Sequence, residues 1–233
     1  RTLTLGNSAT ATLVRAAGIM YGGTFKRWFP TGVPTVISST VAPLYGLFPI
    51  GTSTDYRPVE INSTTSPGTA GYVLASHTDA LTVTTATFVD NVGNTIVRVT
   101  DMKSTVSTLA PFAGGTYDLN VTMTGLSTVG VTTDLYMETI AGAPRGVGTN
   151  AVTAGSTGAP VVKRTALTAA NLVNDFIVGT INLTATPIRT YFYSTGVTSN
   201  WSLTTTWSTA GCGGVAAATT PGATDYVVKT ETK

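Results

Sequence analysis

Threonine makes up about one residue in five of this 233-residue chain, whereas only 10% of the residues are charged. An ordinary soluble domain has about 25% charged residues. A charge-poor chain can be disordered, but hydrophobic residues make up 42% here, which is enough to build a core. Threonine is β-branched and polar, so it can line the solvent face of a strand without carrying a charge. Together with 25 glycines that can form turns, this composition predicts an all-β protein.

Several segments alternate between apolar and polar residues, which is the period of a half-buried antiparallel strand. The clearest is 117–123, where the odd positions are apolar. Strands are expected at 45–50, 56–61, 71–76, 81–89, 95–100, 116–123, 131–138, 160–164 and 176–183. A series of short strands over this length indicates an antiparallel β-sandwich. The glycine-rich stretch 142–158 is expected to be a long surface loop, and 169–175 is the one candidate helix.

The chain is expected to have three parts. Residues 1–44 form an N-terminal solenoid-like or strand-exchange segment, 45–186 the β-sandwich, and 187–233 a C-terminal β segment rich in Trp and Gly. The first boundary follows from proline, which favours turns, edges and strand starts and is frequent after residue 29. Short strands at 2–5, 10–15 and 22–29 suit narrow solenoid coils as well as hairpins.

Both flanking segments carry short motifs in a definite order. Near the start these are Leu3-Thr4-Leu5-Gly6, Gly23-Thr24-Phe25-Lys26-Arg27-Trp28 and Phe48-Pro49-Ile50-Gly51. Near the end they are Tyr193-Ser194, Asn200-Trp201, Thr206-Trp207-Ser208, Cys212-Gly213-Gly214, Thr220-Pro221-Gly222 and Asp225-Tyr226-Val227-Val228. The series resembles secreted surface proteins of the Bacteroidetes group, which are typically cargo of type IX secretion and include large adhesins of gliding bacteria.

That resemblance covers roughly the first 50 and the last 45 residues. It implies an extracellular, cell-surface protein in which one sandwich lies between two β-solenoid stubs, cut from a longer array. Related sequences often have a second cysteine soon after the Asp-x-Val-Val strand. Here the residues after that strand contain none, so Cys212 is either free or paired with a residue beyond this segment.

The sequence offers little from which a catalytic site could be built. His77, in Ser76-His77-Thr78-Asp79, is the only histidine. A catalytic triad needs a nucleophile and a carboxylate that converge on the base, but neighbours on one strand point to opposite faces. Ser76 and Asp79 therefore cannot both face the ring from the strand, and we interpret His77 as a strand-end residue near a turn. One histidine and one cysteine are too few for a His/Cys zinc site.

Carboxylates and phosphate-binding motifs are equally scarce. Glutamate occurs only at Glu60, Glu138 and Glu231, so a glycosidase-like acid/base pair is not expected. Asp90, Asn91 and Asn94 offer calcium ligands, but with a single carboxylate a plain turn is the preferred interpretation. The segment 142–148 lacks the lysine and the strand–loop–helix context of a phosphate loop. No catalytic, cofactor-binding or metal-binding residue is therefore assigned, and no cofactor is expected.

We predict a non-enzymatic structural module of an extracellular filament or adhesin. Its partners would be copies of itself or neighbouring modules of the same polypeptide, joined through sheet edges and incomplete end segments. Basic residues form no cluster beyond Lys26-Arg27 and Lys163-Arg164, so nucleic-acid binding is not expected. The sequence contains no run of 18 apolar residues, so no membrane span is predicted.

The alternative is a carbohydrate-binding accessory sandwich of a secreted hydrolase, with surface glycans as partners. An exposed aromatic row drawn from Tyr136, Tyr191, Tyr193 or Trp201 would support it. The three tryptophans could also form a sugar platform, but Trp201 and Trp207 recur inside the motifs described above. Packing is therefore the simpler role for Trp28, Trp201 and Trp207.

Overall fold

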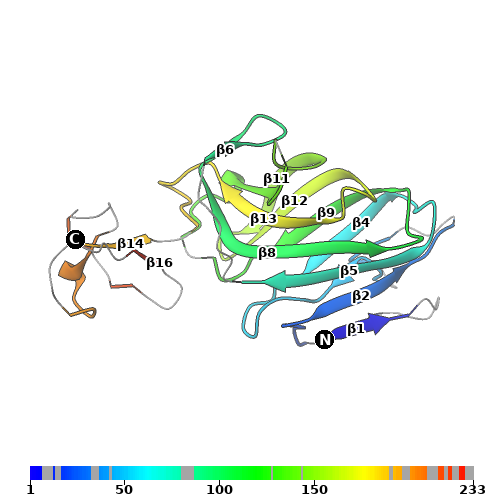
Figure 1. Cartoon of the computed structure of the whole chain (residues 1–233), viewed down its shortest axis with the longest axis horizontal. Helices are drawn as coiled ribbons and strands as arrows, with labels where there is room; N and C mark the ends of the chain where they lie inside the picture. Colours follow the sequence, from blue (N-terminus) through cyan, green and yellow to red (C-terminus); the bar gives the residue numbers. More distant parts are fainter. Residues whose placement is uncertain are drawn as a thin grey trace.

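The computed structural model describes residues 1–6, 13, 17–32, 37–41, 44–79, 87–126, 128–142, 144–188, 191–195, 200–208, 215–217, 220–221 and 226–228. Over these residues the protein is all-β, as the composition predicts, with only two short 3-10 helices, η1 (Thr132–Asp134) and η2 (Thr204–Thr206). Two main sheets form the layers of a β-sandwich (Figure 1). The fold class predicted from the sequence is thus confirmed.

The first sheet has six strands and the second has five. In spatial order the first contains β1 (Thr2–Leu5), β2 (Thr24–Phe29), β5 (Gly71–Thr78), β8 (Arg98–Leu109), β13 (Asn174–Thr180) and β10 (Leu135–Thr139). The second contains β11 (Thr149–Ser156), β12 (Ala159–Thr168), β9 (Thr116–Thr122), β4 (Val59–Thr65) and β3 (Leu47–Phe48). Beyond the sandwich lie the hairpin β6 (Phe88–Val89) with β7 (Thr95–Ile96), and a C-terminal sheet of β15 (Trp207–Ser208), β14 (Tyr191–Ser194) and β16 (Tyr226–Val228).

The core lies between the two sheets and follows the alternation read from the sequence. In β9 the buried side chains are those of Tyr117, Leu119 and Val121, as expected, while the residues between them are partly exposed. The facing layer includes Phe25 and Phe29 of β2, which belong to the same cluster of buried residues. Burying one such side chain contributes about 1.5–3 kcal/mol, so this interface between the sheets is the main source of stability.

The residues of the expected N-terminal segment, 1–44, supply β1 and β2 to the first sheet. β2 pairs antiparallel with β5, whereas β1 pairs parallel with β2. In the C-terminal sheet β14 and β16 are also parallel. Parallel neighbours need a crossover connection and cannot be joined as a tight hairpin. The sequence was compatible with either solenoid-like coils or hairpins in these segments. The β1/β2 and β14/β16 pairs are parallel, so neither of them is a hairpin.

Several local expectations are wrong. The expected loop 142–158 contains the edge strand β11, which hydrogen-bonds to β12; its two faces are both largely exposed, so it lacks the alternation of a half-buried strand. The candidate helix 169–175 is a turn in which the Asn171 side chain bonds Thr168, followed by the start of β13. The strand expected to end at residue 100 continues as β8 to Leu109. The expected strand 10–15 and residues 81–86 lie largely or wholly outside the described residues.

Two buried arginines close the long sides of the sandwich, each reaching across to the opposite sheet. Arg27 of β2 donates from Nη1 to the carbonyl oxygens of Leu44 and, at 3.1 Å, of Leu47 in β3. Arg164 of β12 donates from Nε to Met137 O in β10, at 2.7 Å. A carbonyl at a buried sheet edge needs a donor, and a guanidinium carries five N–H groups. The edges at β3 and β10 are therefore covered from within.

Candidate functional site

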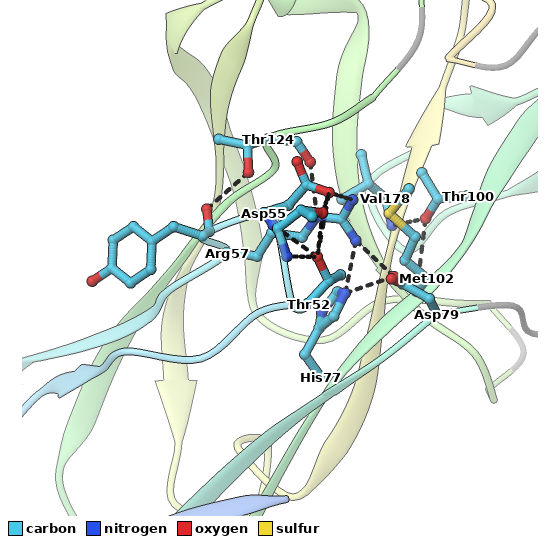
Figure 2. Close-up of polar contacts among 11 residues, drawn as sticks. Thr52, Asp55, Arg57, His77, Asp79, Thr100, Met102, Thr124 and Val178 are labelled. Carbon is cyan, nitrogen blue, oxygen red and sulfur yellow. Dashed lines mark hydrogen bonds and ion pairs between the residues drawn. The ribbon is translucent and has the colours of Figure 1, made fainter. Parts of the chain in front are cut away.

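A third buried arginine, Arg57, lies at the centre of a polar cluster at one end of the sandwich (Figure 2). It precedes β4 of the second sheet and follows a turn in which Thr52 and Asp55 bond one another. From the first sheet, His77 at the end of β5 and Asp79 just beyond it reach the same point. The cluster therefore connects the two layers of the sandwich.

The guanidinium of Arg57 uses all three nitrogen atoms. Nε donates to Thr124 O at 2.7 Å, and Nη1 donates to Asp79 Oδ1 at 2.6 Å. Nη2 lies 3.5 Å from Asp55 Oδ2, at the limit of a hydrogen bond. A buried charge is tolerated when it is both paired and hydrogen-bonded, and Arg57 meets both conditions.

The His77 side chain is buried, and its Nε2 lies 2.9 Å from Asp79 Oδ1 and 2.9 Å from Arg57 Nη1. Burial lowers the pKa of His77 below its usual range, with the hydrogen bond to Asp79 opposing and the charge of Arg57 reinforcing the effect. The ring is therefore neutral at pH 7. Among the described residues Nδ1 has no hydrogen-bond partner. We assign the proton to Nε2, which donates to Asp79, because a buried lone pair without a partner costs less than a buried N–H.

The sequence did not predict this cluster. His77 does lie at the end of its strand, as interpreted, but Asp79, two residues later, lies on the same side and contacts the ring. Arg57, which organises the site, was missed because it comes from the opposite sheet. Burial and, to a smaller extent, the negative charge of nearby Asp79 raise the pKa of Asp101 on β8 to about 6. The contacts of the ring are an arginine and a carboxylate rather than a nucleophile, so the cluster has no triad geometry.

A pocket of about 420 Å³ opens beside this cluster. Its walls come from the residues just before β2, from the turn after Ile50 and from the end of β5. His77 and Asp79 form part of the wall, and the Asp79 side chain is 43% exposed. Asp79 therefore belongs to both the buried cluster and the open pocket.

A second polar cluster is fully enclosed between the sheets around Glu138 and Arg164. Arg164 Nη2 donates to Glu138 Oε2 at 2.8 Å, and Asn150 Nδ2 donates to Glu138 Oε1 at 3.2 Å. Burial raises the pKa of Glu138 to about 7, against the opposing charge of Arg164. Both side chains are completely buried. Because solvent does not reach them, the pair belongs to the enclosed interior between the sheets and not to an accessible site.

The turn at residues 90–94 packs against that enclosed cluster. Asp90 accepts hydrogen bonds from the amides of Val92 and Asn94 and from the side chains of Asn94 and Asn150. These hydrogen bonds outweigh the effect of burial and lower the pKa of Asp90. The turn interpretation is confirmed, and N–H donors occupy both carboxylate oxygens. In the described residues no group of three or more His, Cys, Asp or Glu is placed to hold a metal ion.

The remaining candidates are dispersed. Trp207 is buried and meets the exposed Trp201 edge to face at 4.9 Å, while Trp28 packs on Tyr72 on the first sheet. Packing is thus confirmed for Trp207, whereas Trp28 is half-buried and Trp201 is largely exposed. The glycine-rich residues 142–148 run past Arg164, and a Cβ at Gly146 would lie 2.2 Å from Arg164 Nη2. Cys212 and Glu231 lie outside the described residues, as do the side-chain positions of Tyr191 and Tyr193.

No family model, no curated protein and no solved structure matches this chain. The described part of the chain also contains no helix with the length and hydrophobicity needed to cross a bilayer.

Protonation of His77 is expected to destabilise the protein. Because its pKa in the folded state is lowered, the stability it contributes is present above the unfolded value of about 6.5 and is lost as the pH falls through the folded value. The slope from one proton cannot exceed about 1.4 kcal/mol per pH unit. Asp101, whose pKa is raised, has the opposite effect on stability as the pH falls. The test therefore compares the free energies of unfolding of wild type and His77→Gln, measured with urea between pH 7.5 and 5, so that the contribution of His77 is isolated. A folded-state pKa above 6.5 for the only histidine, measured by NMR, would contradict this expectation.

Proposed function

We propose that this chain is a non-enzymatic structural module of an extracellular filament or adhesin, and that it assembles with copies of itself or with neighbouring modules through an open sheet edge. The observation that carries the proposal is the outer edge of β11 in the second sheet. β11 pairs on one side with β12 and is the terminal strand of its sheet. Among the described strands β11 pairs with no other, and strand addition on that side would supply main-chain hydrogen bonds between chains.

The β11 edge has few of the features that keep edge strands apart. Charged side chains and proline normally prevent edge-to-edge pairing, but β11 contains neither and has one register shift, between Ala151 and Ala154. Val152, at that shift, is 78% exposed. The contrast with β3 and β10 is informative, because buried arginines satisfy carbonyl groups at those edges.

Apolar side chains flank the open edge. η1 lies beside β11, and the exposed Val131 immediately precedes η1. Ile181 donates its amide hydrogen to Asp134 O in η1, and its own side chain is exposed, as is that of Leu183. Exposed apolar residues at and next to η1 favour contact with another protein surface there.

Among the described strands β1 is the terminal strand of the first sheet and is also uncharged, so it offers a second edge for pairing. A contact between β1 of one copy and β11 of the next would join two different surfaces. Contacts of this kind close into rings or continue as filaments, depending on the rotation between copies. The resemblance of the flanking motifs to type IX secretion cargo supports a location at the cell surface.

Electron microscopy of the isolated protein, combined with Val152→Lys, tests the proposal. We expect ordered filaments with one sandwich per repeat, and a critical concentration about tenfold or more higher in the variant, because each tenfold corresponds to about 1.4 kcal/mol. Val173→Lys is the matched control: Val173 is 49% exposed but lies in the turn after β12. Discrete monomers of wild type at high concentration, or equal effects of the two lysines, would refute assembly through β11.

A further inference from the structure

The pocket beside the Arg57 cluster lies at the end of the sandwich where β2 begins and β5 ends. Its volume of about 420 Å³ falls within the range of about 300–1,000 Å³ typical of small-molecule sites. The backbone around it is tightly packed: a Cβ at Gly51 would lie 2.1 Å from Asp55 O, and one at Gly23 would lie 2.7 Å from Arg1 O. The walls are therefore held in place before any ligand binds.

The carboxylate of Asp79 is fixed in this pocket by groups behind it. Arg57 Nη1 and His77 Nε2 both contact Oδ1, at 2.6 and 2.9 Å. Both of these side chains are buried, whereas Asp79 is partly exposed and lines the pocket. Within the described part of the chain no hydrogen bond is formed by Oδ2. One oxygen is thus anchored and the other is left as an oriented acceptor, which reduces the ordering cost of binding.

The charge around the pocket disfavours an anionic ligand. Asp55, Asp79 and Asp101 surround the single cation of Arg57, and that guanidinium is buried behind Asp79. Phosphate, sulfate or a carboxylate would meet the negatively charged Asp79 oxygen, behind which the cation of Arg57 is buried. Electrostatic repulsion would therefore oppose the binding of such groups.

The pocket wall combines this acceptor with hydroxyl groups and one aromatic ring. Thr24, Thr52, Ser76 and Thr78 line it, and Tyr21 stands at the rim with 63% of its surface exposed. The Thr52 hydroxyl is bonded within its own turn, to Asp55 and to the amide of Thr54. A free hydroxyl on this wall can both donate and accept a hydrogen bond, as a sugar hydroxyl does. An ammonium ligand would also be attracted by the Asp79 carboxylate, so the test below includes one, n-butylamine.

We propose that this pocket binds a neutral saccharide, with the ring of Tyr21 packed against the C–H face of the sugar and Asp79 accepting hydrogen bonds from its hydroxyl groups. Arg57 and His77 act behind Asp79 as positioning residues. The site lies at the end of the sandwich and does not involve the β11 edge, so this proposal does not depend on filament assembly.

The test is an NMR titration with D-glucose, D-galactose, D-mannose, N-acetyl-D-glucosamine, cellobiose and lactose. At least one of these sugars is expected to shift the amide signals of Gly23, Gly51 and Thr52, with a dissociation constant of about a millimolar. Asp79→Asn is expected to weaken binding by about tenfold or more, since a hydrogen bond to a charged group contributes about 1.5–3 kcal/mol. Tyr21→Ala is expected to have an effect of about the same size, because it removes the ring surface that packs against the sugar.

Trp201→Ala is the matched control, because Trp201 is 62% exposed but belongs to the C-terminal segment. Its binding should equal that of wild type. Tyr21→Ala is the decisive variant, since Tyr21 is exposed and its removal leaves the Arg57 cluster intact. Failure of every sugar to shift the pocket signals, shifts that persist unchanged in Tyr21→Ala, or shifts produced by n-butylamine alone would each overturn the proposal.

Discussion

Arg164→Met is expected to lower the free energy of unfolding by about 3–5 kcal/mol, the cost of removing one partner of a buried ion pair. The substitution leaves Glu138 without its cation in a position that solvent does not reach. It also removes the donors to Met137 O, Asn91 Oδ1 and Val147 O, at 2.7, 2.7 and 3.1 Å. Methionine fills a similar volume, so the loss reports on the polar contacts rather than on a cavity.

The loss at Arg164 should depend on pH. The pKa of Glu138, about 7, is raised above its unfolded value, so the stability from this carboxyl is present at low pH and is lost as the pH rises through about 7. In the variant the positive charge of Arg164 no longer stabilises the ionised form of Glu138. The decrease in the free energy of unfolding caused by the substitution should therefore be larger at pH 8 than at pH 5. Urea unfolding at both values measures it.

The neighbouring Lys163→Met provides the control for that measurement. Lys163 pairs with Asp118 at 3.2 Å on the outer face of the sheet, where both side chains are partly exposed. Exposed pairs contribute about 0–1 kcal/mol, so little change is expected. An Arg164→Met loss as small as that of Lys163→Met would show that the enclosed pair is not needed for stability. A large loss that does not vary with pH would contradict the raised pKa of Glu138.

The two Lys-Arg dipeptides show how far strand periodicity can be taken. When only the charges in the sequence are considered, Lys26-Arg27 and Lys163-Arg164 are small basic clusters. Period two instead places Arg27 on the same face as Phe25 and Phe29, and that face is buried. Arg164 likewise shares the buried face of β12 with Val162. The signal was present in the sequence, but an arginine in a core-facing position is normally excluded by the cost of burying its charge.

The fold class could be predicted because alternation depends on local residue order, as in β9. β11 could not, because an edge strand with two exposed faces has no apolar stripe to detect. For the candidate site, His77 and Asp79 are two residues apart and on one side of a strand, so their contact was available from spacing. Arg57 was not, because its position beside them depends on how the two sheets stack, which periodicity does not specify.

Gly46→Ala is expected to lower the free energy of unfolding by about 3 kcal/mol, the upper end of the usual range for overpacking. Gly46 lies where the chain before β3 passes β4 at close range. A Cβ there would lie 1.8 Å from Ile61 O, a backbone atom that cannot rotate away. Separating the two segments would break the hydrogen bonds from Gly46 N to Ser38 O and from Ile61 N to Gly46 O, both 2.8 Å.

The damage from Gly46→Ala would reach the core, because Phe48 and Ile61 are fully buried beside this contact and Arg27 caps Leu47 O next to it. Gly158→Ala is the control: Gly158 lies in the turn between β11 and β12, and a Cβ there would have no atom within 4 Å. Its stability should change by less than about 0.5 kcal/mol, as for an ordinary surface substitution. Equal urea midpoints for the two variants would mean that the chain before β3 can move away from β4 without loss of stability, and that the close approach at Gly46 does not constrain this side of the sandwich.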